Sequence, residues 1–518
     1  MTSSNSNSKR VAKNTLLLYM RMFFTMGIGL FTSRIVLNTL GVEDFGLYNV
    51  VGGIVVLLAF LNGAMSSATQ RYLNVALGKN DQNELNKIIR NALCLHLAVA
   101  LIIIFVAETF GLYFVNTFMN IPEPRMEIAN WVYQFSIFSF VASVISVPFT
   151  ASIITHEKMS AFAWMAIFDV SAKLAIVISL TFIEYDKLFI YALLLFIQSI
   201  ITQYIYFMYC RRNFEECRIK EFSIDKSLLK KMTSFSSWSI VGSLGYLIHT
   251  QGIAIVINVF FGVSVNAAQG ISNQVNGIVK QFVSNFLMAF NPQVVKTYAA
   301  GELTEMHKLI LRGCKVACLM VAFFVVPLIL EAPTILKLWL GFVPNYAVIF
   351  VRLILLLTLF DAFTGLLASA KGATGDIKSY QIVLTTIGLT HLPLVWICFK
   401  LGWEPYWAQI VYLFIIIALQ IVRIWFVCNA VKLSIIYFYK EVILRCSIVI
   451  LSATILPLYM HFALPNCTLS SMAVCATSVI LLILFSLGIG FNKNEREHLI
   501  KIITNKIKRK HNGSQINC

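Results

Sequence analysis

Charged side chains are scarce in this chain, and acidic side chains are the scarcest. Only 13% of its 518 residues are charged, against about 25% in an average soluble protein, and Asp and Glu together number 24. Hydrophobic residues make up 58% of the chain. This composition excludes a soluble protein. It predicts an all-α integral membrane protein, because a helix satisfies its own backbone hydrogen bonds in lipid.

The sequence also lacks the motifs of several enzyme and cofactor classes. It contains no Cys-x-x-Cys pair, no Cys/His cluster at metal-ligand spacing, no Ser/His/Asp set and no phosphate-binding glycine loop, so we expect no catalytic residue, metal or cofactor. The eleven cysteines lie mostly in apolar blocks and are expected to be reduced. The net charge of +17 is expected of cytoplasmic loops in a protein with many spans, so we expect no nucleic-acid partner.

Apolar blocks of about twenty residues, the length that a helix needs to cross a bilayer, recur along the whole chain. The first block is too long, and too interrupted by Arg21 and Arg34, to be a cleaved signal peptide. The blocks predict fourteen transmembrane helices, near residues 14–36, 46–68, 91–117, 128–152, 160–183, 188–210, 233–258, 264–290, 311–332, 345–369, 379–400, 406–430, 442–462 and 469–490.

The distribution of Lys and Arg supports this count and predicts the orientation. With the N-terminus inside, the segments predicted to face the cytoplasm hold 31 of the 41 Lys and Arg residues. The outer loops hold only Arg125, Lys187, Lys337 and Lys400. Because positive charge gathers on the cytoplasmic side of a membrane protein, both termini are predicted to be cytoplasmic.

The chain is predicted to consist of two similar halves. Seven residues of one stretch are echoed at an offset of 220 to 224, with Leu37, Asn38, Gly41, Gly46, Asn49, Val51 and Gly53 matched by Ile257, Asn258, Gly262, Gly270, Asn273, Val275 and Gly277. An even number of spans between the copies gives both the same orientation, as in transporters built from parallel repeats. The predicted parts are an N-terminal lobe of six spans (1–210), a cytoplasmic linker (211–232), a C-terminal lobe of six spans (233–430), two further spans (431–490) and a basic cytoplasmic tail (491–518).

Polar residues form a stripe along one predicted span. At helical spacing within 264–290 lie Asn266, Gln269, Asn273, Asn276, Lys280 and Ser284. A helix that faces lipid does not hold six polar side chains in a line, so this face is predicted to line a cavity. Hydrogen-bonded packing between helices is the alternative.

Two cations in the spans stand out because their own helices offer no acidic residue within one turn. These are Lys280, near the middle of its span, and Arg21, in the first span. Burying a cation near the bilayer centre costs on the order of 3 kcal/mol on insertion scales. Each therefore calls for an anionic ligand or for an acidic partner from another helix. Arginine in particular binds phosphate through its forked donors.

The other charged residues inside the spans can be explained by a partner on the same helix or by a position near the end of a span. Lys173 follows Asp169 by one helical turn, which predicts an ion pair. Arg423 lies close to the end of its predicted span, so its side chain is expected to reach the membrane surface. Asp169 and Asp361 are the candidate carriers of a coupling proton or ion.

Three segments resemble those of a known family. Residues 40–48 (LGVEDFGLY), after a first span that ends in Ser33 and Arg34, resemble the signature between the first two helices of the polysaccharide or O-antigen flippases. These belong to the multidrug/oligosaccharidyl-lipid/polysaccharide exporter superfamily. Residues 291–302 (NPQVVKTYAAGE) and 370–378 (AKGATGDIK) resemble its later cytoplasmic loops, and the fourteen-span plan extends the resemblance over nearly the whole chain.

The resemblance implies movement of an undecaprenyl-diphosphate-linked oligosaccharide across a bacterial inner membrane, for polysaccharide, O-antigen or lipopolysaccharide synthesis. Two six-helix lobes would rock about a central cationic cavity. In it Arg21 and Lys280 would bind the diphosphate, and Gln269, Asn273 and Asn276 the sugars. We expect a monomer without enzymatic activity. Its partners would be the lipid-linked substrate, membrane lipids and other polysaccharide assembly proteins.

Two other functions fit parts of the pattern. A multidrug or organic-cation antiporter of the same superfamily would have twelve spans and a membrane acid to bind its cation, and this chain is predicted to have fourteen spans and a cationic stripe. A membrane polysaccharide polymerase or ligase would need a sizeable outer loop to hold its acceptor. The outer loops predicted here are short.

Overall fold

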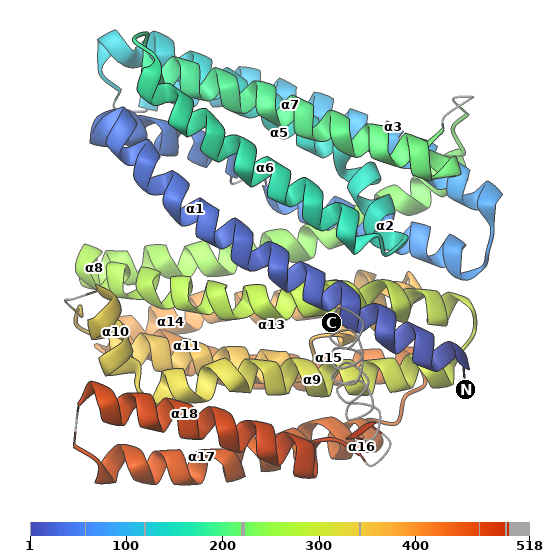
Figure 1. Ribbon diagram of the computed structural model, residues 1–518, viewed down its shortest axis with the longest axis vertical. Coiled ribbons are helices and arrows are strands. Elements are labelled where there is room, and N and C mark those ends of the chain that lie inside the picture. Colours follow the sequence, from blue (N-terminus) through green and yellow to red (C-terminus); the bar gives the residue numbers. More distant parts are fainter. Residues whose placement is uncertain are drawn as a thin grey trace, which may run out of the picture. The chain divides into compact units, whose positions relative to one another are not determined.

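The computed structural model describes residues 2–56, 59–118, 121–218, 223–340, 343–465, 467–492 and 495–496. All regular structure in these residues is helical (Figure 1), which confirms the predicted all-α class. The helices are α1 (Thr2–Val56), α2 (Ala59–Gly78), α3 (Gln82–Val106), α4 (Leu112–Phe118), α5 (Met126–Thr155), α6 (Met159–Ser179), α7 (Lys187–Asn213), α8 (Lys226–Ala299), α9 (Leu303–Leu330), α10 (Ala332–Leu340), α11 (Ala347–Ala362), α12 (Leu367–Thr374), α13 (Lys378–Leu389), α14 (His391–Lys400), α15 (Trp407–Ala430), α16 (Ile435–Phe438), α17 (Arg445–Ala463) and α18 (Thr468–Phe485). Short 3₁₀ or π segments are η1 (Ala107–Gly111), η2 (Glu123–Arg125), η3 (Leu180–Phe182), η4 (Glu215–Cys217), η5 (Tyr439–Leu444) and η6 (Ser486–Gly490).

Most of the predicted spans coincide with helices suited to a membrane. In the described residues, ten helical stretches are long and apolar enough to cross a bilayer, or eleven if the bent pair of α11 and α12 is one span. The remaining predicted spans, 14–36, 46–68 and 264–290, fall on residues of α1, α2 and α8. The total of fourteen therefore stays a prediction.

Two glycines break the longest helices in the same way. α1 is interrupted at Gly41, with φ 79° and ψ 172°, and α8 at Gly262, with φ 78° and ψ −174°. Residues with a side chain rarely adopt this backbone region, whereas glycine enters it at little cost. Because these glycines are one of the echoed pairs, equivalent positions of the predicted repeat share a backbone conformation.

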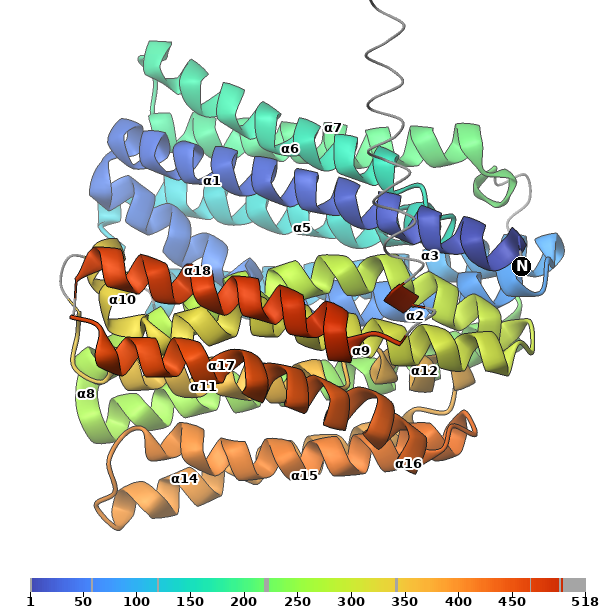
Figure 2. The same ribbon diagram turned by 60° about the horizontal axis from the view of Figure 1, so that its bottom comes forward.

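The chain divides into two compact units. The first unit comprises Met1–His249, Asn285–Met306 and Ser369–Leu389, and the second comprises Thr250–Ser284, His307–Ala368 and Thr390–Cys518. Within the first unit, α5 packs along α7, and α1 packs along α6 (Figure 1). Within the second, α11 packs along α15, and α17 lies beside α18 (Figure 2). The lobe boundaries predicted from the sequence stay a prediction.

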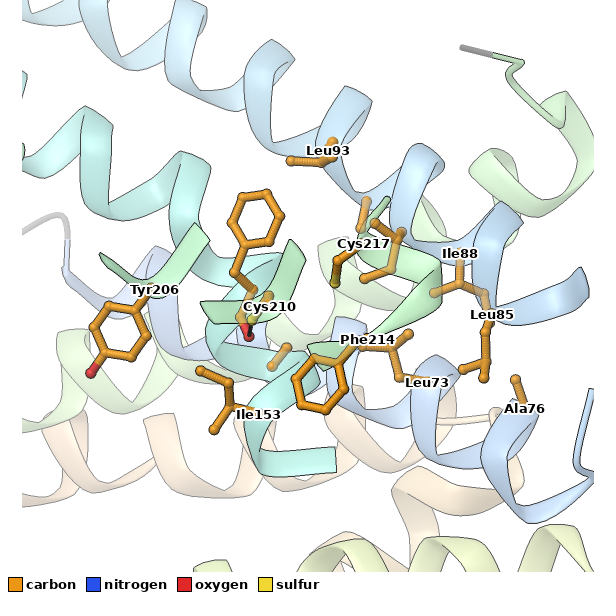
Figure 3. Packing of buried hydrophobic residues seen from close by; sticks show 14 of the residues in the cluster. Leu73, Ala76, Leu85, Ile88, Leu93, Ile153, Tyr206, Cys210, Phe214 and Cys217 are labelled. Carbon is orange, nitrogen blue, oxygen red and sulfur yellow. Dashed lines mark hydrogen bonds between the residues drawn. The ribbon is translucent and has the colours of Figure 1, made fainter. Parts of the chain in front are cut away.

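An apolar cluster in the first unit joins the ends of α2, α3, α5 and α7 to the segment that follows α7 (Figure 3). Leu73, Ile88 and Ile153 are buried there beside Phe214 and Cys217. The cluster therefore anchors the beginning of the predicted linker on the helix ends. Residues 219–222 of that linker, and 493–494 and 497–518 of the predicted tail, lie outside the described residues.

A buried carboxylate fixes the same segment. Glu216 Oε1 lies 2.6 Å from His156 Nε2, and its Oε2 accepts a hydrogen bond of 3.4 Å from Gln82 Nε2. The His156 ring stacks on Phe214, with ring centroids 4.2 Å apart. Burial acts to raise the pKa of Glu216, but the hydrogen bonds, led by that of His156, outweigh it and hold the pKa below its usual value.

Stability should depend on this carboxylate at acid pH. A carboxyl group whose pKa is lowered by folding stabilises the protein above its unfolded pKa, about 4.3 for Glu. The contribution is lost as the pH falls through the folded-state pKa. We expect the wild type to melt above Glu216→Gln at pH 7 and the difference to shrink towards pH 3, measured by thermal melting in detergent. Glu215→Gln, at an exposed neighbour, is the control. A difference between wild type and Glu216→Gln that is constant with pH would contradict this account.

Candidate functional site

A cavity of about 840 Å³ lies inside the first unit. This volume is within the range of about 300–1,000 Å³ that is typical of ligand pockets. Its walls come from α1, α2, α5, α6 and α7, and its polar side chains other than tyrosine are Asn62, Ser66, Ser136, Ser139, Ser143, Thr150, Asp169, Lys173, Gln198, Ser199, Thr202 and Gln203. Among the described residues that line the cavity, only Asp169 and Lys173 are charged.

The two charges in the cavity wall form an ion pair. Lys173 Nζ donates to Asp169 Oδ2 at 2.8 Å, which confirms the pair predicted from their spacing. Gln198 Nε2 donates to Asp169 Oδ1 at 2.6 Å and to Thr202 Oγ1 at 2.9 Å. The carboxylate is therefore neutralised by a cation on its own helix. The coupling role of Asp169 stays a prediction.

Arg21 belongs to the same unit and lies near the cavity wall. Its Nη2 donates to Asn285 Oδ1 at 3.1 Å, and its guanidinium carbon lies 4.7 Å from the centroid of the Phe162 ring. It also interacts electrostatically with Tyr206, a residue that lines the cavity. In the described part of the chain, Arg21 makes no ion pair with an Asp or Glu, so no carboxylate there neutralises its charge.

The polar stripe of α8 belongs mainly to the second unit, where two of its amides bind other helices. Gln269 is buried and accepts a hydrogen bond from Gln409 on α15. Asn276 accepts one from Thr358 on α11. Asn273 is exposed and accepts from Gln269 at 3.3 Å. These bonds of Gln269 and Asn276 are of the kind expected for packing between helices, and a role in sugar binding stays a prediction for all three stripe residues.

Lys280 is part of a charged cluster around Asp361 in the second unit. Arg423 Nη1 donates to Asp361 Oδ1 at 3.1 Å, and Gln420 Nε2 donates to the same oxygen at 3.2 Å. Lys280 interacts electrostatically with this carboxylate. Two cations around one carboxylate give the ionised cluster a net charge of +1. Arg423 also donates to Thr364 Oγ1 at 2.8 Å, and the expectation that its side chain reaches the membrane surface stays a prediction.

The predicted site residues are thus divided between the two units. Arg21 and Asp169 lie in the first, and the others, Gln269, Asn273, Asn276, Lys280 and Asp361, lie in the second. Lys280 of α8 interacts with Asp361 of α11. This acidic partner comes from another helix, because α8 has no acidic residue within one turn of Lys280. The serines of the cavity were not among the predicted site residues. Ser136, Ser139 and Ser143 recur on α5 at steps of 3 and 4. This spacing places them on one face of the helix, a signal that indicates a polar surface there.

A second charged cluster of the first unit lies at the turn between α5 and α6. The Glu157 side chain is only 2% exposed. Glu157 Oε1 accepts hydrogen bonds from Lys296 Nζ at 2.9 Å and from Gln293 Nε2 at 2.6 Å. Lys296 also donates to the backbone oxygen of Thr155. Since Gln293 and Lys296 belong to the motif at 291–302, this part of the motif holds the end of α8 against the turn.

Arginines hold the other two motifs in place. Arg125 Nη2 donates to Asp44 Oδ2 of the 40–48 motif at 3.0 Å, and Arg125 also pairs with Asp186 at the start of α7. Arg71 Nε donates to the backbone oxygen of Gly372, in the 370–378 motif, at 2.8 Å. Each motif therefore has a structural role within the first unit.

The sequence of the chain matches a known protein family and one membrane protein of known sequence. The model of a family described as polysaccharide biosynthesis protein matches residues 11–297, more than half of the chain. The uncharacterized membrane protein EpsK of Bacillus subtilis (strain 168) is 19% identical over 316 residues. This match covers 61% of the chain and 62% of EpsK, so the chain spans less than two thirds of that relative's length.

Solved structures of transporters share the fold. A multidrug resistance MATE family transporter of the MOP superfamily, in an outward-facing conformation, has a TM-score of 0.69 and 13% identity, with 83% of this chain and 96% of that chain covered. A MOP superfamily transporter from Pyrococcus furiosus has a TM-score of 0.68 and 13% identity, with 82% and 97% covered. At these identities the likeness shows the fold alone.

Proposed function

Because this chain belongs to the polysaccharide biosynthesis protein family and has the fold of MOP superfamily transporters, we propose that it is a flippase for a lipid-linked oligosaccharide. The carrier would be undecaprenyl diphosphate, moved from the cytoplasmic to the outer leaflet of a bacterial inner membrane by alternating access. Both termini would lie in the cytoplasm. The glycan would serve polysaccharide or O-antigen synthesis.

The observation that carries this proposal is the position of Arg21 near a polar cavity. A sugar headgroup cannot enter hydrocarbon without losing its hydrogen bonds, whereas a polyprenyl tail is stable in lipid. A polar chamber therefore serves the headgroup while the tail stays in the bilayer. Arg21 is held by an amide and an aromatic ring. It could thus offer its forked donors to a phosphate at the entrance of that chamber.

The second unit would contribute a further positive site. The cluster of Lys280, Arg423 and Asp361 has an excess of one positive charge when ionised, which favours an anion. We propose that Lys280 meets the diphosphate when the headgroup reaches this unit, and that Gln269, Asn273 and Asn276 bind its sugars.

Coupling would depend on the two paired carboxylates. Asp169 is bound to Lys173, and Asp361 to Arg423. A proton or metal ion that binds either carboxylate must compete with the cation already there. Binding of a coupling proton or ion would therefore break one of these ion pairs, and this change would be linked to transport.

Deletion of the gene in its native host tests the flippase function. We expect single lipid-linked repeat units to accumulate on the inner face of the membrane, and the intact gene to restore export. Accumulation on the outer face would instead indicate a polymerase. Normal glycan export together with altered sensitivity to organic cations would indicate a multidrug antiporter.

A further inference from the structure

We propose that the cavity of the first unit binds the neutral sugar residues of the glycan while Arg21 binds the phosphate next to them. This inference rests on the proposed flippase function, and it assigns one part of the substrate to one cavity. Three properties of the cavity support it: its charge balance, its unused hydrogen-bonding groups and its position beside Arg21.

The charge balance favours a neutral ligand. The described residues of the cavity lining include one carboxylate, Asp169, and one ammonium group, Lys173, whose charged atoms are 2.8 Å apart. An unpaired carboxylate inside a membrane would call for a cation, but this one has its cation built in. A ligand that brings no net charge leaves the pair intact. Polyhydroxylated sugars are ligands of this kind.

The hydrogen-bonding capacity of the wall matches such a ligand. Ser139, Ser199 and Gln203 line the cavity, and none of these side chains is engaged in a hydrogen bond to the described residues. Ser136 and Thr150 donate to backbone oxygens of their own helix, at 2.7 and 3.0 Å. Their oxygens therefore remain available as acceptors. The wall thus presents both donors and acceptors, as a sugar does.

The walls also offer apolar surfaces and a connection to Arg21. Phe135, Phe140 and Tyr206 are among the lining residues, and aromatic rings can pack against the C–H faces of sugar rings. Tyr206 interacts electrostatically with both Asp169 and Arg21. A sugar attached directly to a phosphate held by Arg21 would therefore enter the cavity at this wall.

Filling the cavity is the direct test. Ser199→Phe places a large ring into it, and Gln203→Leu removes an amide at similar size. Ile201→Phe is the matched control, because Ile201 lies on the same helix, is 47% exposed and does not line the cavity. In a deletion strain of the native host, we expect both cavity variants to lower glycan export at least ten-fold at equal protein level, and the control to retain export.

A binding measurement on the purified full-length protein separates sugar recognition from a folding defect. The probe is the neutral oligosaccharide released by mild acid from the host's own polysaccharide. Its affinity should fall at least ten-fold in Ser199→Phe and in Gln203→Leu, while the melting temperature stays near that of the Ile201→Phe control. Replacing sodium by choline in the buffer should not change the affinity.

Each other outcome has a distinct meaning. If either cavity variant exports glycan normally or binds the oligosaccharide as the wild type does, the cavity is not the sugar site, although the flippase function stands. Sodium-dependent loss or gain of affinity would make the cavity a cation site and overturn the inference. If the wild-type gene itself fails to restore export, the proposed function fails instead.

Discussion

Replacing Arg21 by alanine is expected to reduce glycan export at least ten-fold at unchanged protein level. The substitution removes a cation that the described acidic residues do not neutralise. A charge-assisted hydrogen bond is worth about 1.5–3 kcal/mol, and 1.4 kcal/mol already corresponds to a factor of ten. The measurement is the amount of surface polysaccharide in a deletion strain that carries the variant.

A second variant of Arg21 separates the effect of its charge from that of its geometry. Arg21→Lys keeps the charge but loses the planar fork, so we expect a level of export between those of the wild type and of Arg21→Ala.

Lys280→Ala should also impair export, because it removes the excess positive charge around Asp361. Lys230→Ala, at an exposed position of α8, should have no effect. Normal export in both alanine variants, Arg21→Ala and Lys280→Ala, would remove these residues from the site.

Lys296→Met is expected to cause the largest loss of stability, about 3–5 kcal/mol in the free energy of unfolding. The variant removes the ammonium group that lies 2.9 Å from Oε1 of Glu157, whose side chain is only 2% exposed. The hydrogen bond that Gln293 donates to the same carboxylate oxygen comes from a neutral amide and does not replace the lost charge. Denaturation of the purified protein in detergent measures the effect, with Lys230→Met as an exposed control on the same helix.

The double variant Lys296→Met/Glu157→Gln shows whether the buried charge is the cause. Glutamine keeps the shape of Glu157 and removes its charge, so most of the lost stability should return. Such recovery is the expected coupling between two directly bonded residues. If the double variant is less stable than Lys296→Met, the loss must instead come from packing at the α5–α6 turn.

Much of the fold could be predicted because its signals are local. The apolar composition predicts the all-α membrane class, and the motif at 40–48 predicts the family that the match to residues 11–297 confirms. The pair of Lys173 and Asp169 also followed from spacing alone, since both residues lie on one helical face.

The missed contacts are those between distant parts of the chain. Arg423 and Asp361 are 62 residues apart, and no spacing rule relates side chains on different helices. The same limit applies to Glu157 and Lys296, which are 139 residues apart. The cavity was missed for a similar reason, because its polar side chains come from four different helices, α2, α5, α6 and α7.

The matching breaks at Gly41 and Gly262 bear on the origin of the chain. Duplication and fusion of a shorter gene would leave the same backbone conformation at equivalent points of both copies. The ancestral product would have carried one such glycine and worked as a pair of identical subunits inserted in the same direction. In the predicted repeat, such a fusion would have let the copies diverge, leaving Arg21 in one and Lys280 in the other.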